Sequence, residues 1–352
     1  MFGRMMNNYY YGKSGKGDFR KEDLPETRSQ LFRDTLRTRL SALCRLNLLY
    51  MLVWLPTMIV IMISAMNMYS SLTQYMLIQD SDYSSYTEVM SQYGQENIIS
   101  EEQFNEIAAQ PEQFSQYLSL SLRSSLTRLL LWLIPCIAIT GPFTAGLSYV
   151  TRNWARDEHA FVWSDFKDAV RENWKQALVI SAITGFLPLA VYEGWSFYGE
   201  MASQNMILII PQVLVILVGI IWAISVTYMY PIIVTYELKQ KDVLRNSLLL
   251  GVARLPFSVG IRLLHCVPVL LFFVAVWFFG LDLMIGLMIL GGYYMLIGFS
   301  LSRFITASYT NAVFDRFINS RIEGAKVNQG LKTPEDDDDE DEAGTEDETD
   351  PE

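Results

Sequence analysis

Ionisable side chains could do chemistry within this chain, but few of them fall inside its six long apolar stretches. None of the stretches has an Asp, Glu, Lys or Arg near its centre. Glu193 and Asp282 stand near one end of their stretches, and Arg262, His265 and Arg303 near the other. A membrane hydrolase or an ion-coupled carrier needs carboxylates or imidazoles that face one another within the bundle. We therefore expect that the protein is not an enzyme and has no catalytic residues.

Metal and disulfide chemistry have equally little support. The chain has two histidines, His159 and His265, and neither has a second His or Cys at ligand spacing. Its three cysteines, Cys44, Cys136 and Cys266, are odd in number and lie in or beside apolar stretches, so they indicate no disulfide framework. We expect buried small residues there, with no metal and no cofactor.

The apolar stretches themselves predict the class of protein. They cover residues 46–66, 129–150, 177–191, 206–234, 263–281 and 283–301. A helix of about 20 residues crosses the roughly 30 Å of hydrocarbon in a bilayer. The sequence thus predicts an all-α, polytopic membrane helix bundle with six transmembrane helices.

The basic residues predict the orientation of the bundle. Of the 27 Lys and Arg residues, 25 fall in alternate segments, and only Arg123 and Arg128 fall elsewhere. The segments with the 25 bases are 1–45, 151–176, 236–262 and 303–332. The positive-inside rule places them, and both chain ends, on the cytoplasmic side. We expect a multi-pass membrane protein.

The two ends of the chain differ from the 26–330 membrane domain. Residues 1–25 show no hydrophobic period and predict a flexible cytoplasmic arm. The net charge of −11 comes from the last 18 residues, which hold 13 acids and no base. Such a run repels itself and has nothing to bury, so residues 331–352 predict a disordered acidic tail. We expect no nucleic-acid partner.

A basic amphipathic helix is predicted between the arm and the first span. Apolar residues recur at helical spacing over 26–45, and arginines take the other positions. These candidate lipid-facing residues are Arg28, Arg33, Arg37 and Arg39. They would bind the anionic inner leaflet, with membrane lipids as partners, if the helix lies on its surface. The alternative is a helix packed under the bundle.

The outer segment 67–122 is too long for a simple turn. It has eight acids and no Lys or Arg. Ser100 and Gln103 form a capping box, and Pro111 suits the first turn of a further helix. We expect an extracytoplasmic helical insertion that rests on the bundle as a lid or partner surface; recognition of an external ligand by its tyrosines is the alternative.

Two cytoplasmic connections, 151–176 and 236–262, predict interfacial helices. In the first, Ser164 is the expected N-cap, with Asp165 in the first turn, where the helix dipole favours negative charge. In the second, the residues expected to turn inward are Leu244, Leu248, Val252 and Leu255.

One stretch carries a family resemblance. Ile139-Thr-Gly-Pro-Phe-Thr-Ala-Gly-Leu-Ser-Tyr-Val150, the later Asp165-Phe166 pair and the upstream Leu46-Asn47-Leu48 resemble the core and first span of the YesL family. The resemblance covers 40–66 and 130 to about 310, and the outer insertion departs from it. The residues of this motif with structural uses are Thr140, Gly141, Pro142, Ala145, Asp165 and Phe166.

Two members of the motif have physical roles that follow from their types. Gly141 and Ala145 are small residues four apart, which allow close helix contact in a bilayer. Pro142 frees a backbone carbonyl that a neighbouring helix or water must satisfy.

The resemblance implies a cellular process for the protein but identifies no catalytic or binding residues. YesL proteins are bacterial membrane proteins of unknown function, often encoded beside sugar-import and sugar-degradation genes. It therefore implies an accessory or regulatory partner of a carbohydrate uptake system, with a sugar-importer complex as the partner. The alternative is a transporter or permease subunit for a small solute such as a sugar. Gly251, followed after nine residues by Ile261, partly matches the coupling loop of such permeases.

Overall fold

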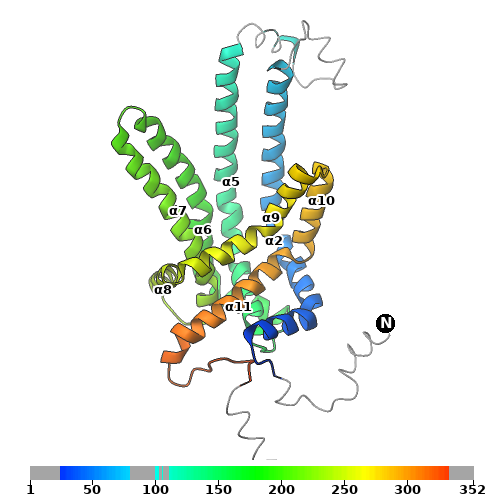
Figure 1. Ribbon diagram of the computed structural model, residues 1–352, viewed down its shortest axis with the longest axis vertical. Helices are drawn as coiled ribbons and strands as arrows, with labels where there is room; N and C mark the ends of the chain where they lie inside the picture. Colours follow the sequence, from blue (N-terminus) through cyan, green and yellow to red (C-terminus); the bar gives the residue numbers. More distant parts are fainter. Residues whose placement is uncertain (1–23, 80–99, 103–104, 106–110, 333–352) are drawn as a thin grey trace, which may run out of the picture.

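The computed structural model describes residues 24–79, 100–102, 105 and 111–332 (Figure 1). The main helices are α2 (Arg28–Gln79), α5 (Pro111–Trp154), α6 (Ser164–Ala202), α7 (Ile209–Ile233), α8 (Gln240–Ala253), α9 (Leu255–Phe279), α10 (Leu283–Tyr293) and α11 (Phe299–Phe317). Short helical turns are η2 (Met206–Leu208), η3 (Tyr294–Gly298) and η4 (Asn319–Arg321). The described residues form no β-strand.

The predicted all-α class and the six spans are confirmed. Six helical stretches in the described residues are long and apolar enough to cross a membrane. The sixth runs continuously from Leu283 to Arg321 and joins α10, η3, α11 and η4.

The spans are arranged as a splayed bundle. In Figure 1, α2 and α5 run antiparallel and project beyond the other helices, α6 and α7 form a leaning hairpin, and α9 crosses the middle. Side chains are fully buried mainly where α2, α5, α6, α7 and α11 meet. The largest of them include Trp154, Tyr228, Phe304, Phe314 and Leu46.

The Gly141–Pro142 pair brings α5 against α6. A Cβ at Gly141 would overlap Ser181 and the carbonyl of Ala177, so only glycine permits this approach. Pro142 has no N–H for the carbonyl four residues earlier, Ala138, and the Ser181 hydroxyl donates to that oxygen at 2.7 Å. The structure thus shows both the close helix contact and a neighbour that satisfies the freed carbonyl.

The predicted interfacial helix in 151–176 is wrong as a separate element. Residues 164–176 are the first turns of α6, because apolar periodicity continues unbroken into the span. Ser164 is not the N-cap: Trp163 holds that position without a side-chain cap, and the Asp165 carboxylate instead accepts a hydrogen bond from the Phe161 N–H at 2.9 Å.

The second connection does contain a helix, α8, but only part of its inward face was predicted correctly. Leu244 packs partly buried against the core as expected. Val243, Ser247 and Gly251 are buried, whereas Leu248, Val252 and Leu255 are exposed. The small residues decide this register, because a Cβ at Gly251 would stand 3.2 Å from Ile224 of α7. Residues 255–262 belong to α9.

Residues 28–45 are the beginning of α2 rather than a separate helix. These first turns, dark blue in Figure 1, run across the lower end of the bundle. Leu31, Thr35 and Leu43 are buried, and the Phe32 and Phe304 rings stack at 5.0 Å. The apolar face therefore packs under the bundle, as in the second of the two predicted arrangements.

Described parts of the outer segment continue α2 and α5 rather than resting on the bundle. Residues 67–79 extend α2, and Pro111 is the first residue of α5 as its position predicts. Gln103 of the expected capping box lies outside the described residues, as do most of the expected arm and acidic tail. Pro25, assigned to the arm, is described and buried.

Candidate functional site

A π-helical turn, η3, lies between α10 and α11 and leaves backbone groups without their usual partners. Asn47 of α2 provides the missing partners. Its amide nitrogen donates to the carbonyls of Tyr294 and Met295, both at 2.8 Å, and its amide oxygen accepts from the Ser300 N–H at 2.9 Å. Asn47 is fully buried. The turn is thus fixed to the first span.

Beside this turn is a cavity of about 210 Å³. Residues from α2, α7, α9, η3 and α11 surround it. They are Tyr50, Trp54, Thr227, Arg262, His265, Tyr294, Gly298, Phe299, Ser302, Arg303 and Thr306. π-Helical turns within helices are frequent at functional sites, which makes this cavity the candidate binding site.

Two guanidinium groups dominate the electrostatics of the cavity. Among the described residues, neither Arg262 nor Arg303 has a carboxylate within 4.0 Å. The Arg303 guanidinium carbon lies 5.1 Å from the centre of the Tyr230 ring, a cation–π contact that leaves the positive charge in place. The cavity is therefore electropositive.

The cavity also presents buried donors that no described group accepts. The indole N–H of Trp54, the hydroxyl of Thr227 and the Nε–H of Arg262 are buried and have no hydrogen-bond partner in the described structure. His265, by contrast, is engaged: its Nε2 donates to the Ser302 carbonyl at 3.0 Å. The free groups suit a ligand that accepts hydrogen bonds.

Sequence reasoning treated Arg262, His265 and Arg303 as separate residues near the ends of spans and missed the site. One signal was present, because Arg262 and His265 are three apart on one face of α9 and Arg303 and Thr306 are three apart on α11. The pairing of those two faces depends on how α9 and α11 lie relative to each other, which no local pattern encodes.

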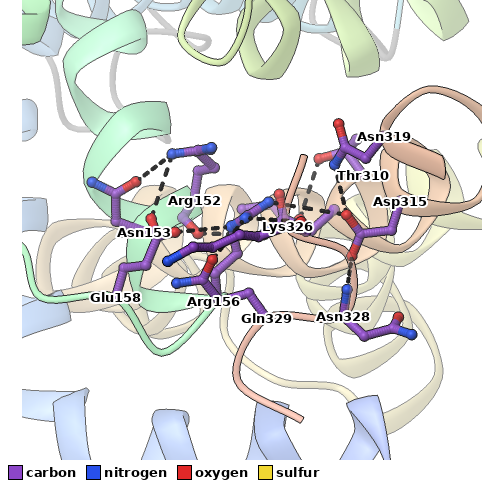
Figure 2. A network of polar contacts seen from close by, with 12 residues as sticks. Arg152, Asn153, Arg156, Glu158, Thr310, Asp315, Asn319, Lys326, Asn328 and Gln329 are labelled. Carbon is purple, nitrogen blue, oxygen red and sulfur yellow. Dashed lines mark hydrogen bonds and ion pairs between the residues drawn. The ribbon is translucent and has the colours of Figure 1, made fainter. Parts of the chain in front are cut away.

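A second polar cluster lies at the end of the bundle where α5 and α11 finish (Figure 2). Its centre is Asp315 of α11, which is only 4% exposed. The carboxylate accepts hydrogen bonds from Arg28 at 2.7 Å, from the Asn319 side chain at 2.6 Å and from the Asn328 N–H at 3.2 Å. Such pairing offsets the cost of burying the charge. Asp315 thus joins the start of α2 to the segment after α11.

Arg156 extends this cluster to the turn between α5 and α6. Its guanidinium contacts Glu158 at 3.1 Å and donates to the Gln329 side chain at 3.1 Å. Gly330 follows with a φ of +83°, and a Cβ there would stand 2.8 Å from the Arg156 carbonyl oxygen. We call residues 319–332 and these contacts the strap.

The strap places the two ends of the described chain together. The Lys332 N–H donates to the Pro25 carbonyl at 3.1 Å. Tyr236 after α7 also joins, because its hydroxyl donates to Asn319 at 2.7 Å. Burial and the Asp315 charge raise the pKa of Tyr236 to about 12, so it stays a neutral donor at physiological pH.

The structure separates the four arginines predicted to face lipid. Arg28 pairs with Asp315, and Arg39 lies over the Trp154 ring at 5.8 Å. Arg33 and Arg37 are exposed. Only these last two are thus free of packing roles that would prevent them from meeting lipid.

The motif residues cluster where α5 packs on α6. Besides Gly141 and Pro142, Thr140 donates to the Ile137 carbonyl at 2.8 Å, and Ala145 and Phe166 are buried in the core. They therefore position helices and do not contact the cavity.

The fold defines a polytopic, α-helical, membrane-type protein. One family model matches residues 126–194, and it describes a protein of unknown function, DUF624. This is the family that YesL proteins belong to. No curated protein and no solved structure matches the chain. The matched region contains the contact between α5 and α6 and the turn that joins them. The cavity residues lie outside it.

Proposed function

We propose that the protein is a non-catalytic membrane protein of the bacterial cell membrane that assists or regulates a carbohydrate uptake system. The strap is the observation that carries this proposal. Its buried polar contacts fix the segment before α2, the turn after α5 and the segment after α11 against one another. The surface that results is formed by the exposed residues 320–324 and 326–328. By the positive-inside rule this surface faces the cytoplasm, where the ATPase of an importer also lies.

α11 would connect this surface to the cavity. Asp315 in the strap and Arg303 in the cavity are twelve residues apart on the helix that runs from Phe299 to Phe317. At 1.5 Å per residue that is roughly 18 Å. A partner bound at the strap would therefore sense a displacement of the cavity wall through a single rigid element.

The sugar-uptake setting is what the resemblance to the YesL family implies. Partner recovery tests it. The full chain, purified in mild detergent from its own cells, should bring down an importer ATPase together with permease subunits. Recovery of the chain alone under conditions that preserve other membrane complexes would contradict the proposal.

Two glycine variants within the strap sharpen this test. Gly330→Ala should reduce partner recovery, because a Cβ there meets the Arg156 carbonyl and the φ is positive. Gly324→Ala is the matched control: its φ is +76°, but nothing lies within 4 Å of the added Cβ. Equal partner recovery with both variants would show that the strap is not the docking surface.

The second candidate function is a carrier for a small solute. The cavity favours it, because transporter sites form where irregular helices line a space between spans. Reconstitution distinguishes the two functions. Purified protein that moves a solute into liposomes without any partner supports the carrier and contradicts the accessory function.

A further inference from the structure

We infer that the cavity beside η3 binds a phosphate-type oxyanion, either the headgroup of an anionic lipid or a small soluble phosphate ester. The first step is charge. Burying a guanidinium costs free energy unless an anion compensates it. Arg262 and Arg303 are both half-buried at this cavity, the Nε–H of Arg262 is buried without a partner, and neither has a carboxylate within 4.0 Å among the described residues. Arginine binds oxyanions with paired N–H donors, which makes such a ligand its natural counter-ion.

The second step is the match in charge. A carboxylate offers one negative charge, whereas a phosphate monoester carries about −1.5 to −2 at neutral pH. Arg262 and Arg303 provide two positive charges from two helices. The dianion therefore neutralises the pair more completely.

The third step is hydrogen bonding. The partnerless groups that line the cavity, on Trp54, Thr227 and Arg262, all have a hydrogen to donate. The Ser302 carbonyl, which could have bound a cation, already accepts from His265 and from Thr306. A site of free donors and occupied acceptors selects an anion over a cation.

The fourth step is size and shape. A volume of about 210 Å³ exceeds the ~150 Å³ engineered cavity that holds benzene, so it accommodates a phosphate together with a small organic group. Trp54 and Phe299, with ring centres 4.9 Å apart, provide an apolar wall for that group.

The depth of the cavity suits a phosphate. Arg262 stands immediately before the apolar stretch 263–281. The end of an apolar stretch is expected near the headgroup level of a bilayer rather than at its centre. The inference goes beyond the proposed function, because occupancy of the cavity needs no protein partner.

The test measures binding by the full chain in nanodiscs of neutral lipid, by thermal unfolding at matched ionic strength. Probes are inorganic phosphate, glycerol 3-phosphate and, in a separate series, nanodiscs containing phosphatidic acid. A saturable rise in melting temperature with any of these supports the proposal. Stabilisation by glycerol 3-phosphate identifies a soluble ester as the source, and stabilisation by phosphatidic acid alone identifies a lipid. No saturable rise with any probe overturns it, whatever the variants do.

Variants then locate the binding. Arg262→Gln and Arg303→Gln should each weaken the response at least tenfold, because each removes a charge-assisted contact. Arg303→Lys, which keeps the charge but loses the paired donors, should fall between these and the unaltered protein. Arg245→Gln changes an exposed arginine of α8 outside the cavity and should leave binding unchanged. An equal loss in Arg245→Gln would assign the effect to general electrostatics and overturn the site.

Discussion

Single polar side chains provide partners for buried backbone groups and charges that the apolar helices leave unpaired. Asn47 satisfies the π turn, Ser181 satisfies the carbonyl freed by Pro142, and Asp315 neutralises Arg28. In hydrocarbon or in a packed core an unsatisfied backbone group costs several kcal/mol, so each of these residues supports a whole element.

Asn47→Leu keeps the size of the side chain and removes three hydrogen bonds. Two carbonyls and one N–H would stay buried without partners, so we expect a loss of about 2–4 kcal/mol in stability. Unfolding in detergent measures it. The neighbouring Leu48→Ala, at a position 46% exposed, should cost far less. Similar losses in both variants would mean that η3 does not depend on Asn47.

Asp157 holds a left-handed conformation, with φ of 57°, in the turn after α5. Partial desolvation in the turn raises the pKa of its carboxyl group, and Arg39 partly opposes this. A raised pKa means that this group stabilises the fold at low pH and that the benefit disappears as pH rises through its folded pKa. Asp157→Asn tolerates the same φ and stays neutral. It should therefore melt higher than the unaltered protein at pH 7, and the difference should shrink on acidification.

Asp157→Ala separates the backbone from the charge. Alanine is disfavoured at positive φ by about 1–2 kcal/mol, so this variant should be less stable than Asp157→Asn at every pH. If alanine and asparagine behave alike, the turn does not impose the left-handed conformation.

At the scale of elements, helix contacts are set by small residues rather than by the large apolar ones. Gly141 places α5 on α6, and Gly251 places α8 on α7. Continuous apolar stretches predicted the spans, since the hydrocarbon of a bilayer selects for them. Apolar periodicity, used for the connections, failed at 164–176 and on α8, because it cannot show whether a helix ends or which close approach determines the register.

Gly141→Ala should destabilise the bundle by more than about 2 kcal/mol, because its Cβ would overlap Ser181 and the Ala177 backbone. Gly260→Ala in α9 is the matched control. Nothing lies within 4 Å of its added Cβ, so replacing a helical glycine there should be neutral or stabilising by about 0.5–1 kcal/mol. Equal melting temperatures for the two variants would contradict the packing of α5 on α6.

At the scale of the whole molecule, the chain is a set of apolar spans with two polar features, the cavity and the strap, joined by α11. The number of spans followed from the number and length of the apolar stretches in the sequence. The cavity did not, because Arg262 and Arg303 are 41 positions apart in sequence and line one cavity only through the tertiary placement of α9 and α11. Asn47 within the first apolar stretch was a further local sign, because it predicts a buried polar partner for that span.

The central claim is that the strap, with both ends of the chain, faces the cytoplasm. Single cysteines in a background without Cys44, Cys136 and Cys266 test it on intact cells with a membrane-impermeant thiol reagent. Gln204→Cys, exposed between α6 and α7, should be labelled, and Lys241→Cys, exposed on α8, should be labelled only after the cells are opened. Labelling of Lys241→Cys on intact cells, with Gln204→Cys protected, would invert the topology and contradict the account.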